Sequence, residues 1–187
     1  MNRAPADRVS ALALWSALSV VYLVWGSTYL AIRFTVETIP PFLSASARFM
    51  VSGAFLYLWR RGAGDPAPTP QERTNAAVIG IFLLVGGNGA VVWAAQFIPS
   101  SLTALLVATV PLWMILIAAL RRAGSKPSPH EIGGTLIGFC GAVLLIGWTA
   151  GGAPPASLHG AIAVLGGSCL WAMGSISGKT ADLPASP

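Results

Sequence analysis

The stretch WGSTYLAIRFTVETIPPFLSASARF, which runs from Trp25 to Phe49, joins two apolar segments at the pair Pro40-Pro41, and each segment carries an arginine. Two consecutive prolines cannot continue a helix, so the chain must turn there, and we expect the two segments to be adjacent antiparallel neighbours. An arginine at the centre of a membrane helix costs about 2.5–3.5 kcal/mol on insertion scales. Arg33 and Arg48 therefore need a physical reason for their positions.

The composition identifies an integral membrane protein that is surrounded by a lipid bilayer. Of 187 residues, 55% are hydrophobic and 9% are charged, whereas soluble domains carry about 25% charged residues. The net charge of +5 is spread over short loops, without the basic cluster that nucleic-acid binding requires, so we expect no nucleic-acid partner. The two cysteines lie inside apolar runs, and the sequence predicts no disulfide, no metal site and no cofactor.

Apolar segments of about the length that a spanning helix needs, roughly 20 residues, recur along the whole chain. They lack the alternation of apolar and polar positions that marks a membrane β-barrel, so helices are the remaining way to span the bilayer. The sequence predicts an all-α, polytopic membrane helix bundle. Its six segments are Leu12–Val36, Phe42–Trp59, Ala76–Phe97, Leu102–Leu120, Ile132–Trp148 and Leu158–Ile176.

Lysine and arginine residues outside these segments alternate strictly between the two sides. They occur before the first segment and after the second, fourth and sixth, and the other three connections contain none. The positive-inside rule therefore places both ends, residues 1–10 and 179–187, in the cytoplasm, and the double-proline turn outside the cell. The basic residues are Arg3, Arg8, Arg60, Arg61, Arg73, Arg121, Arg122, Lys126 and Lys179.

The sequence lacks the groups that pumps and enzymes need. An ATP-driven pump requires a phosphate-binding loop, and the GKT tail at residues 178–180 has Met173 where the first glycine of such a loop should stand. No segment carries a carboxylate in its interior, which argues against a carboxylate proton relay. No membrane-embedded nucleophile has an evident base beside it. We therefore expect a protein that is not an enzyme.

Two interpretations are open for each arginine. Arg48 lies seven residues beyond Pro41, which is about 10 Å along a helix, and Arg33 lies at a similar or shallower depth before Pro40. Arg33 could extend its side chain to the outer interface, aided by Glu37. Arg48 could make a fixed contact with helix-end carbonyls or a polar neighbour. Alternatively, both could line an electropositive outer vestibule that attracts polar or anionic groups of a small-molecule substrate.

Further polar and aromatic residues are candidates for the same pathway. Asn88, between two glycines, could make an interhelical hydrogen bond or approach a ligand, and Thr109 precedes Pro111, which predicts a kink and a locally polar wall. Trp25 and Trp93 could line the pathway or pack against lipid and neighbouring helices. Small residues at four-residue spacing predict close helix packing without a ligand: Gly134, Gly138, Ala142, Gly174 and Gly178.

A weak internal similarity suggests that part of the sequence is repeated. Trp25 is followed eight residues later by Arg33, and Trp171 is followed eight residues later by Lys179. If the sixth segment repeats the first, the unit has five helices, and an odd number inserts the second copy upside down, as in many secondary transporters. By itself this spacing could arise by chance.

The sequence resembles the EamA family of the drug/metabolite transporter superfamily over nearly its whole length. The elements that carry the resemblance are WGSTY at Trp25–Tyr29, the double proline followed by Arg48-Phe49, Gly87-Asn88-Gly89, the turn Ala108–Pro111, and LWAMGS at Leu170–Ser175. The resemblance implies a ten-helix secondary transporter of two inverted five-helix repeats, which exports small metabolites or drugs across the inner (plasma) membrane. On this basis residues 11–149 form one EamA domain, and residues 150–178 hold the helix that opens a second.

The chain departs from that pattern because four helices of the second repeat are missing. We therefore expect either a fragment, inactive or incomplete by itself, or a half-transporter that acts as a homodimer. A membrane assembly protein that transports nothing is the alternative to both.

Overall fold

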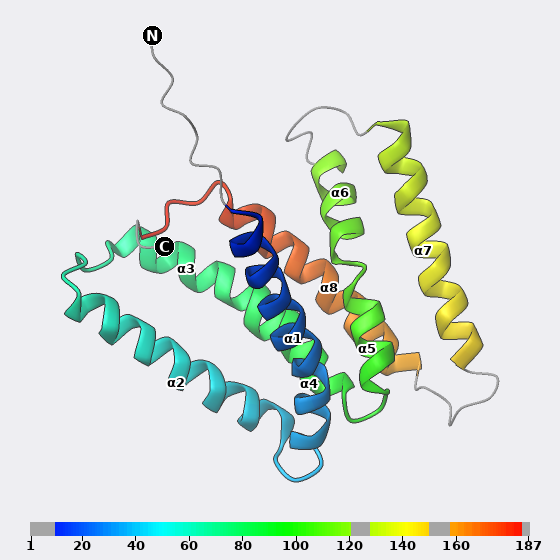
Figure 1. Ribbon diagram of the computed structural model, residues 1–187, viewed down its shortest axis with the longest axis horizontal. Helices are drawn as coiled ribbons and strands as arrows, with labels where there is room; N and C mark the ends of the chain where they lie inside the picture. The colour runs from blue at the N-terminus through cyan, green and yellow to red at the C-terminus, as the bar shows by residue number, and fades with distance from the viewer. Residues whose placement is uncertain (1–9, 121–127, 150–157, 185–187) are drawn as a thin grey trace.

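The computed structural model describes residues 10–120, 128–149 and 158–184, and these residues form helices joined by turns, without a strand (Figure 1). The predicted all-α membrane bundle is thus confirmed. Residues 1–9, 121–127, 150–157 and 185–187 lie outside the described ranges, and with them several of the basic residues used to predict the orientation. The helices are α1 (Ala11–Thr35), α2 (Pro41–Gly62), α3 (Pro70–Gly80), the π-helix η1 (Ile81–Asn88), α4 (Gly89–Ala94), α5 (Ser100–Val107), α6 (Val110–Leu120), α7 (Pro129–Thr149) and α8 (Leu158–Gly178).

Among the described residues, five helical stretches are long and apolar enough to cross a membrane. They are Ala11–Thr35, Pro41–Gly62, Pro70–Ala94, Ser100–Leu120 and Leu158–Gly178, and they correspond to five of the six predicted segments. The remaining predicted segment, Ile132–Trp148, is the fifth along the chain and lies within α7, a helix of 21 residues. That α7 crosses the membrane remains a prediction.

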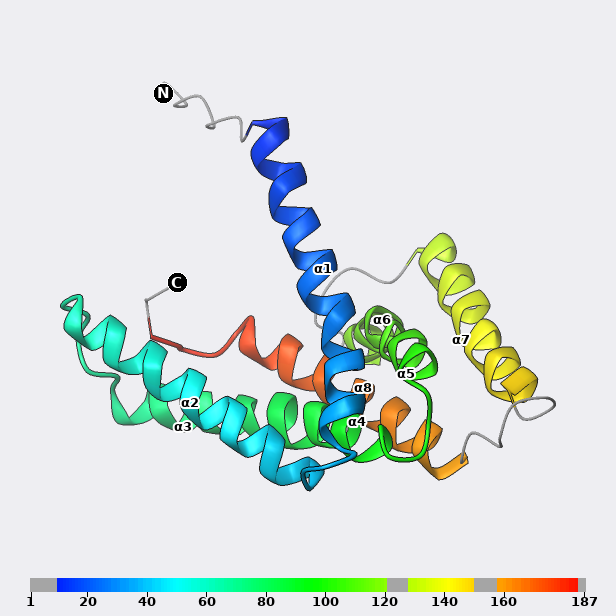
Figure 2. The same cartoon turned by 60° about the horizontal axis from the view of Figure 1, so that its bottom comes forward.

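The double proline forms the predicted turn, but the two helices that it joins do not pack along their lengths. Pro40 has an extended conformation, with ψ 133°, and Pro41 begins α2, as expected of a ring that fixes φ and lacks an N–H. Within the described residues, α1 packs mainly against α5 and α2 against α4, and the two helices diverge from the turn (Figure 2). The prediction of antiparallel neighbours was therefore wrong beyond the turn.

A small apolar cluster explains this divergence. Ile32 of α1 and Ala45 of α2 are buried with Val91, Val92 and Ala95 from the C-terminal end of the third span. The third span therefore contacts both helices near the turn, while farther along α1 packs on α5 of the fourth span and α2 packs on α4 of the third. The first half of α1 extends away from the bundle with its apolar side chains exposed (Figure 2), as expected of a surface that contacts lipid.

Helix α8 lies at the centre of the bundle. It packs against η1, α4, α6, α5 and α3, and it is the most buried of the five spanning stretches. Its Ala161 and Val164 are buried in one apolar cluster with Ile98, Leu102 and Leu106. The sixth span therefore completes the core around which the third and fourth spans are arranged.

Glycines bring α8 close to the third span. A Cβ atom added at Gly87 would lie 2.8 Å from the Trp171 ring, and one added at Gly167 would lie 2.6 Å from Ala90 Cβ. Gly174 is equally close to its neighbours, at 2.9 Å. Small residues thus let the two backbones approach, which is how membrane helices pack without a hydrophobic driving force between them.

The predicted glycine spacing is confirmed at Gly174 and at Gly138, where a Cβ would lie 2.6 Å from Leu112 Cδ1. Gly178 has ordinary contact with Ile79. Gly134, by contrast, has no described neighbour within 4 Å, so the prediction of close packing was wrong there.

Two irregularities interrupt the spans. The third span changes from α-helical to π-helical over Ile81–Asn88, a rare geometry that is frequent at functional sites. The fourth span breaks at Ala108 and Thr109, between α5 and α6, just before Pro111, where the sequence predicts a kink. Both irregular segments belong to spans that pack on α8.

Candidate functional site

Arg48 and Asn88, which are 40 residues apart in the sequence, contact each other between α2 and η1. Arg48 Nη2 donates a hydrogen bond to Asn88 Oδ1 over 3.3 Å. The guanidinium carbon of Arg48 also lies 4.6 Å from the centre of the Phe49 ring, a cation–π distance. The structure therefore brings together two of the residues that the sequence predicts for the substrate pathway, and it holds the arginine on two sides.

A shallow, open hollow lies beside this arginine on one face of α2. Its volume is about 560 Å³, and it is lined by Ala47, Arg48, Val51, Ser52 and Phe55 of α2. The Ser52 hydroxyl donates to the carbonyl oxygen of Arg48 over 2.8 Å, so its own proton is already used. The walls of the hollow are almost entirely apolar, and the charged end of Arg48 contributes almost nothing to them.

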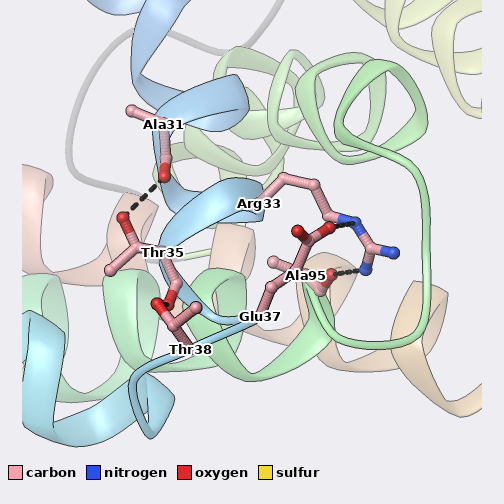
Figure 3. Close-up of polar contacts among 6 residues, drawn as sticks. All are labelled: Ala31, Arg33, Thr35, Glu37, Thr38 and Ala95. Atoms are coloured by element: carbon pink, nitrogen blue, oxygen red, sulfur yellow. Dashed lines mark hydrogen bonds and ion pairs between the residues drawn. The ribbon is translucent and has the colours of Figure 1, made fainter.

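Arg33 makes a different kind of contact, shown in Figure 3. It lies in the last turn of α1, where its Nη1 donates to the carbonyl oxygen of Ala95, the residue that caps α4. Its Nε lies 3.9 Å from the Glu37 carboxylate. Cations stabilise helix C-termini, so the contact joins the C-terminal ends of the first and third spans and supports a structural interpretation of Arg33.

Trp25 meets Trp171 across the bundle. Their ring centres are 6.3 Å apart, and Trp25 Nε1 donates to the Tyr29 hydroxyl over 3.1 Å. Trp171 in turn packs on Gly87, next to Asn88. The sequence identifies Trp25, but not Trp171, as a candidate for the pathway. The one signal for Trp171 is the eight-residue spacing between a tryptophan and a basic residue, which it shares with Trp25. A series of contacts therefore links the first span to the residue that holds Arg48.

Two predicted site residues have other partners. The Trp93 ring lies within 5.8 Å of the rings of Phe97 and His159, in a cluster between the end of the third span and the start of α8. Thr109 is 3% exposed, and its hydroxyl donates to the Leu106 carbonyl over 2.6 Å. The structure therefore does not join either residue directly to Arg48.

A second hollow, of about 640 Å³, lies at the other end of α2, and its lining includes one ion pair. Arg60 Nε is 2.7 Å from the Asp65 carboxylate, and Arg61 donates to the Asp65 carbonyl. No group of three His, Cys, Asp or Glu side chains within residues 10–120, 128–149 and 158–184 could hold a metal ion.

The arginines therefore differ in how their charge is balanced. Arg33 and Arg60 each have a carboxylate within 4.0 Å, and in the described part of the chain Arg48 has none. An amide oxygen such as that of Asn88 accepts a hydrogen bond without neutralising a cation. Among the described residues, the charge of Arg48 therefore has no neutralising partner.

Comparison with known proteins gives a consistent result. The EamA-like transporter family matches residues 12–147. The chain is similar to the inner membrane transporter YedA of Escherichia coli K12, with 40% identity over 174 residues, which is 92% of this chain and 55% of YedA. The protein PagO of Salmonella typhimurium is 33% identical over 120 residues, or 63% of this chain and 39% of PagO.

A more distant relative has a name that includes a substrate. The aromatic amino acid exporter YddG of Ancylobacter novellus is 25% identical over 183 residues, or 96% of this chain and 60% of YddG. The chain thus spans about half the length of the curated relatives that it matches. No solved structure matches it.

Proposed function

The chain belongs to the EamA-like transporter family, and from that membership we propose that it acts in the export of small metabolites or drugs across the inner membrane. Its apolar helices and its similarity to an inner membrane transporter identify a multi-pass inner membrane protein. The direction of transport, the substrate and the cytoplasmic position of the N-terminus are parts of the proposal.

The contact between Arg48 and Asn88 is the observation that carries this proposal. Both residues lie well inside long apolar helices, where an unpaired charge facing lipid is costly and polar side chains usually face a cavity or pathway. If these helices only anchored or assembled the protein, apolar residues would serve better at both positions. A water-accessible pathway beside α2 and η1 explains why these two polar residues lie inside apolar helices.

The outward direction is supported by the name of one relative. YddG of Ancylobacter novellus is called an exporter, and we extend that direction to this chain. We also propose that a complete pathway needs a second half, supplied either by a second repeat or by a second copy of this chain, because the chain covers 55% of YedA.

Efflux from loaded cells tests the proposal. Escherichia coli lacking its own YedA and expressing this chain, with and without a second repeat joined to it, is loaded with phenylalanine or with ethidium. We expect faster, energy-dependent loss of at least one compound than from cells with an empty vector. Met50→Ala is the matched control variant on α2, since its side chain is 73% exposed and lies outside the hollow.

The result that contradicts transport is equally clear. If no form of the chain accelerates efflux of either compound, while the chain purifies in a stable complex with another membrane protein, it is an assembly protein.

A further inference from the structure

We propose that Arg48 binds the carboxylate of the transported molecule, and that the substrates are organic monocarboxylates with an apolar body. This inference rests on the proposed function, because it names the substrate class for the same site. Three properties of the site carry it: the unbalanced charge of Arg48, the way in which its guanidinium is held, and the apolar hollow beside it.

The first property is the charge. The contacts of Arg33 and Arg60 include a carboxylate at 3.9 Å and 2.7 Å respectively. For Arg48 the described residues provide only an amide oxygen and an aromatic face. A single uncompensated cation at membrane depth favours a single negative charge. A phosphate monoester, with nearly two negative charges at neutral pH, would need a second cation.

The second property is orientation. A guanidinium group has five N–H donors in a planar fork, and the hydrogen bond to Asn88 uses one of them. Phe49 lies against the group 4.6 Å away, which limits its rotation and leaves N–H groups at its edge available. A planar carboxylate can accept two parallel hydrogen bonds from such a fork.

The third property is the hollow itself. Its volume of about 560 Å³ is within the range of about 300–1,000 Å³ of typical small-molecule sites. Val51 and Phe55 lie one and two turns beyond Arg48 on α2 and line the same hollow. A ligand whose carboxylate meets Arg48 would therefore place an aryl or alkyl group against these two side chains.

A binding measurement with matched probes tests the inference on the whole chain purified in detergent. Phenylacetate, phenylacetamide and phenyl phosphate share an aromatic ring and differ in charge. We expect phenylacetate to raise the melting temperature of the protein in a dose-dependent way, and the neutral amide and the phosphate to have little effect. Equal shifts with phenylacetamide, or a larger shift with phenyl phosphate, would overturn the proposal.

Variants at the site sharpen the test. We expect Arg48→Gln to raise the Kd for phenylacetate about tenfold to a hundredfold, as the loss of charge-assisted hydrogen bonds predicts. Asn88→Asp keeps the arginine but supplies a carboxylate in place of the amide, so it should compete with the ligand and weaken binding as well. Met50→Ala should bind like the parent chain. Unchanged binding in both site variants, each eluting as a single species in size-exclusion chromatography, would refute the inference.

Comparison with the efflux assay separates the two proposals. Efflux of ethidium without any binding of phenylacetate would leave the transport function standing and remove the substrate class. Binding of phenylacetate that depends on Arg48, with no efflux of any compound, would support the carboxylate site and contradict the transport function.

Discussion

Replacing Gly167 with alanine should loosen the packing of α8 on the third span. A Cβ atom at this position would lie 2.6 Å from Ala90 Cβ, and 3.2 Å and 3.3 Å from the carbonyl oxygens of Gly87 and Gly86. Carbon atoms pack best at about 3.5–4.0 Å, so the new methyl group overlaps Ala90 by about 1 Å. Two of the three neighbours are backbone atoms, which cannot rotate away as a flexible side chain could.

The expected magnitude follows from a comparison with the adjacent glycine. Overpacking of this kind costs about 1–3 kcal/mol. At Gly166, no described atom lies within 4 Å of the place that a Cβ would take, so Gly166→Ala meets no obstacle. Both substitutions increase helix propensity by the same amount. The difference in stability between the two variants therefore comes from the steric clash alone. For a chain of this size, this loss of stability corresponds to a melting temperature about 2–12 °C lower for Gly167→Ala than for Gly166→Ala.

Thermal unfolding in one detergent, followed by tryptophan fluorescence, measures this difference. Adding Ala90→Gly to Gly167→Ala removes the shortest contact and should restore part of the lost stability, which a double-mutant cycle reports as a coupling energy. If the two alanine variants melt together, or if Ala90→Gly restores nothing, the contact between α8 and the third span is not the one described above.

Two further predictions concern the orientation of the chain and the contacts of Arg33. In a background without the native cysteines, Thr38→Cys should react with a membrane-impermeant maleimide in intact cells and Ala67→Cys only after permeabilisation; the opposite pattern would invert the proposed orientation. Arg33→Gln removes the hydrogen bond to Ala95 and should cost about 1 kcal/mol, near the low end for charged donors because the side chain is 39% exposed. Glu37→Gln, at the end of an exposed pair, should cost less than about 0.5 kcal/mol, and equal melting temperatures for these two variants would argue against the Ala95 contact.

The sequence predicts most of the secondary structure because lipid imposes a simple rule on it. Helices are required across the bilayer, so the length of each apolar run defines a span, and the prolines at 40, 41 and 111 mark a turn and the neighbourhood of a break. Arg48 and Asn88 are recognisable as candidates because polar residues are costly inside such runs.

The arrangement of the helices is not predictable in the same way. In a soluble protein the apolar face of a helix identifies its buried side, whereas here apolar residues face both lipid and protein. Nothing in the sequence therefore shows that α8 lies at the centre, that α1 and α2 diverge, or that Trp171 meets Trp25. The glycines of η1 indicate close packing, but not with which helix.

The π-helical segment η1 has a consequence for how the length of the third span can change. Deleting one residue from α3 would turn everything after it by about 100° and move Asn88 away from Arg48. Deleting one residue inside Ile81–Asn88 would instead tighten that segment towards an α-helix and leave its two ends facing the same neighbours. We therefore expect relatives of different length to gain or lose a residue within η1 while they keep the same helix contacts on both sides.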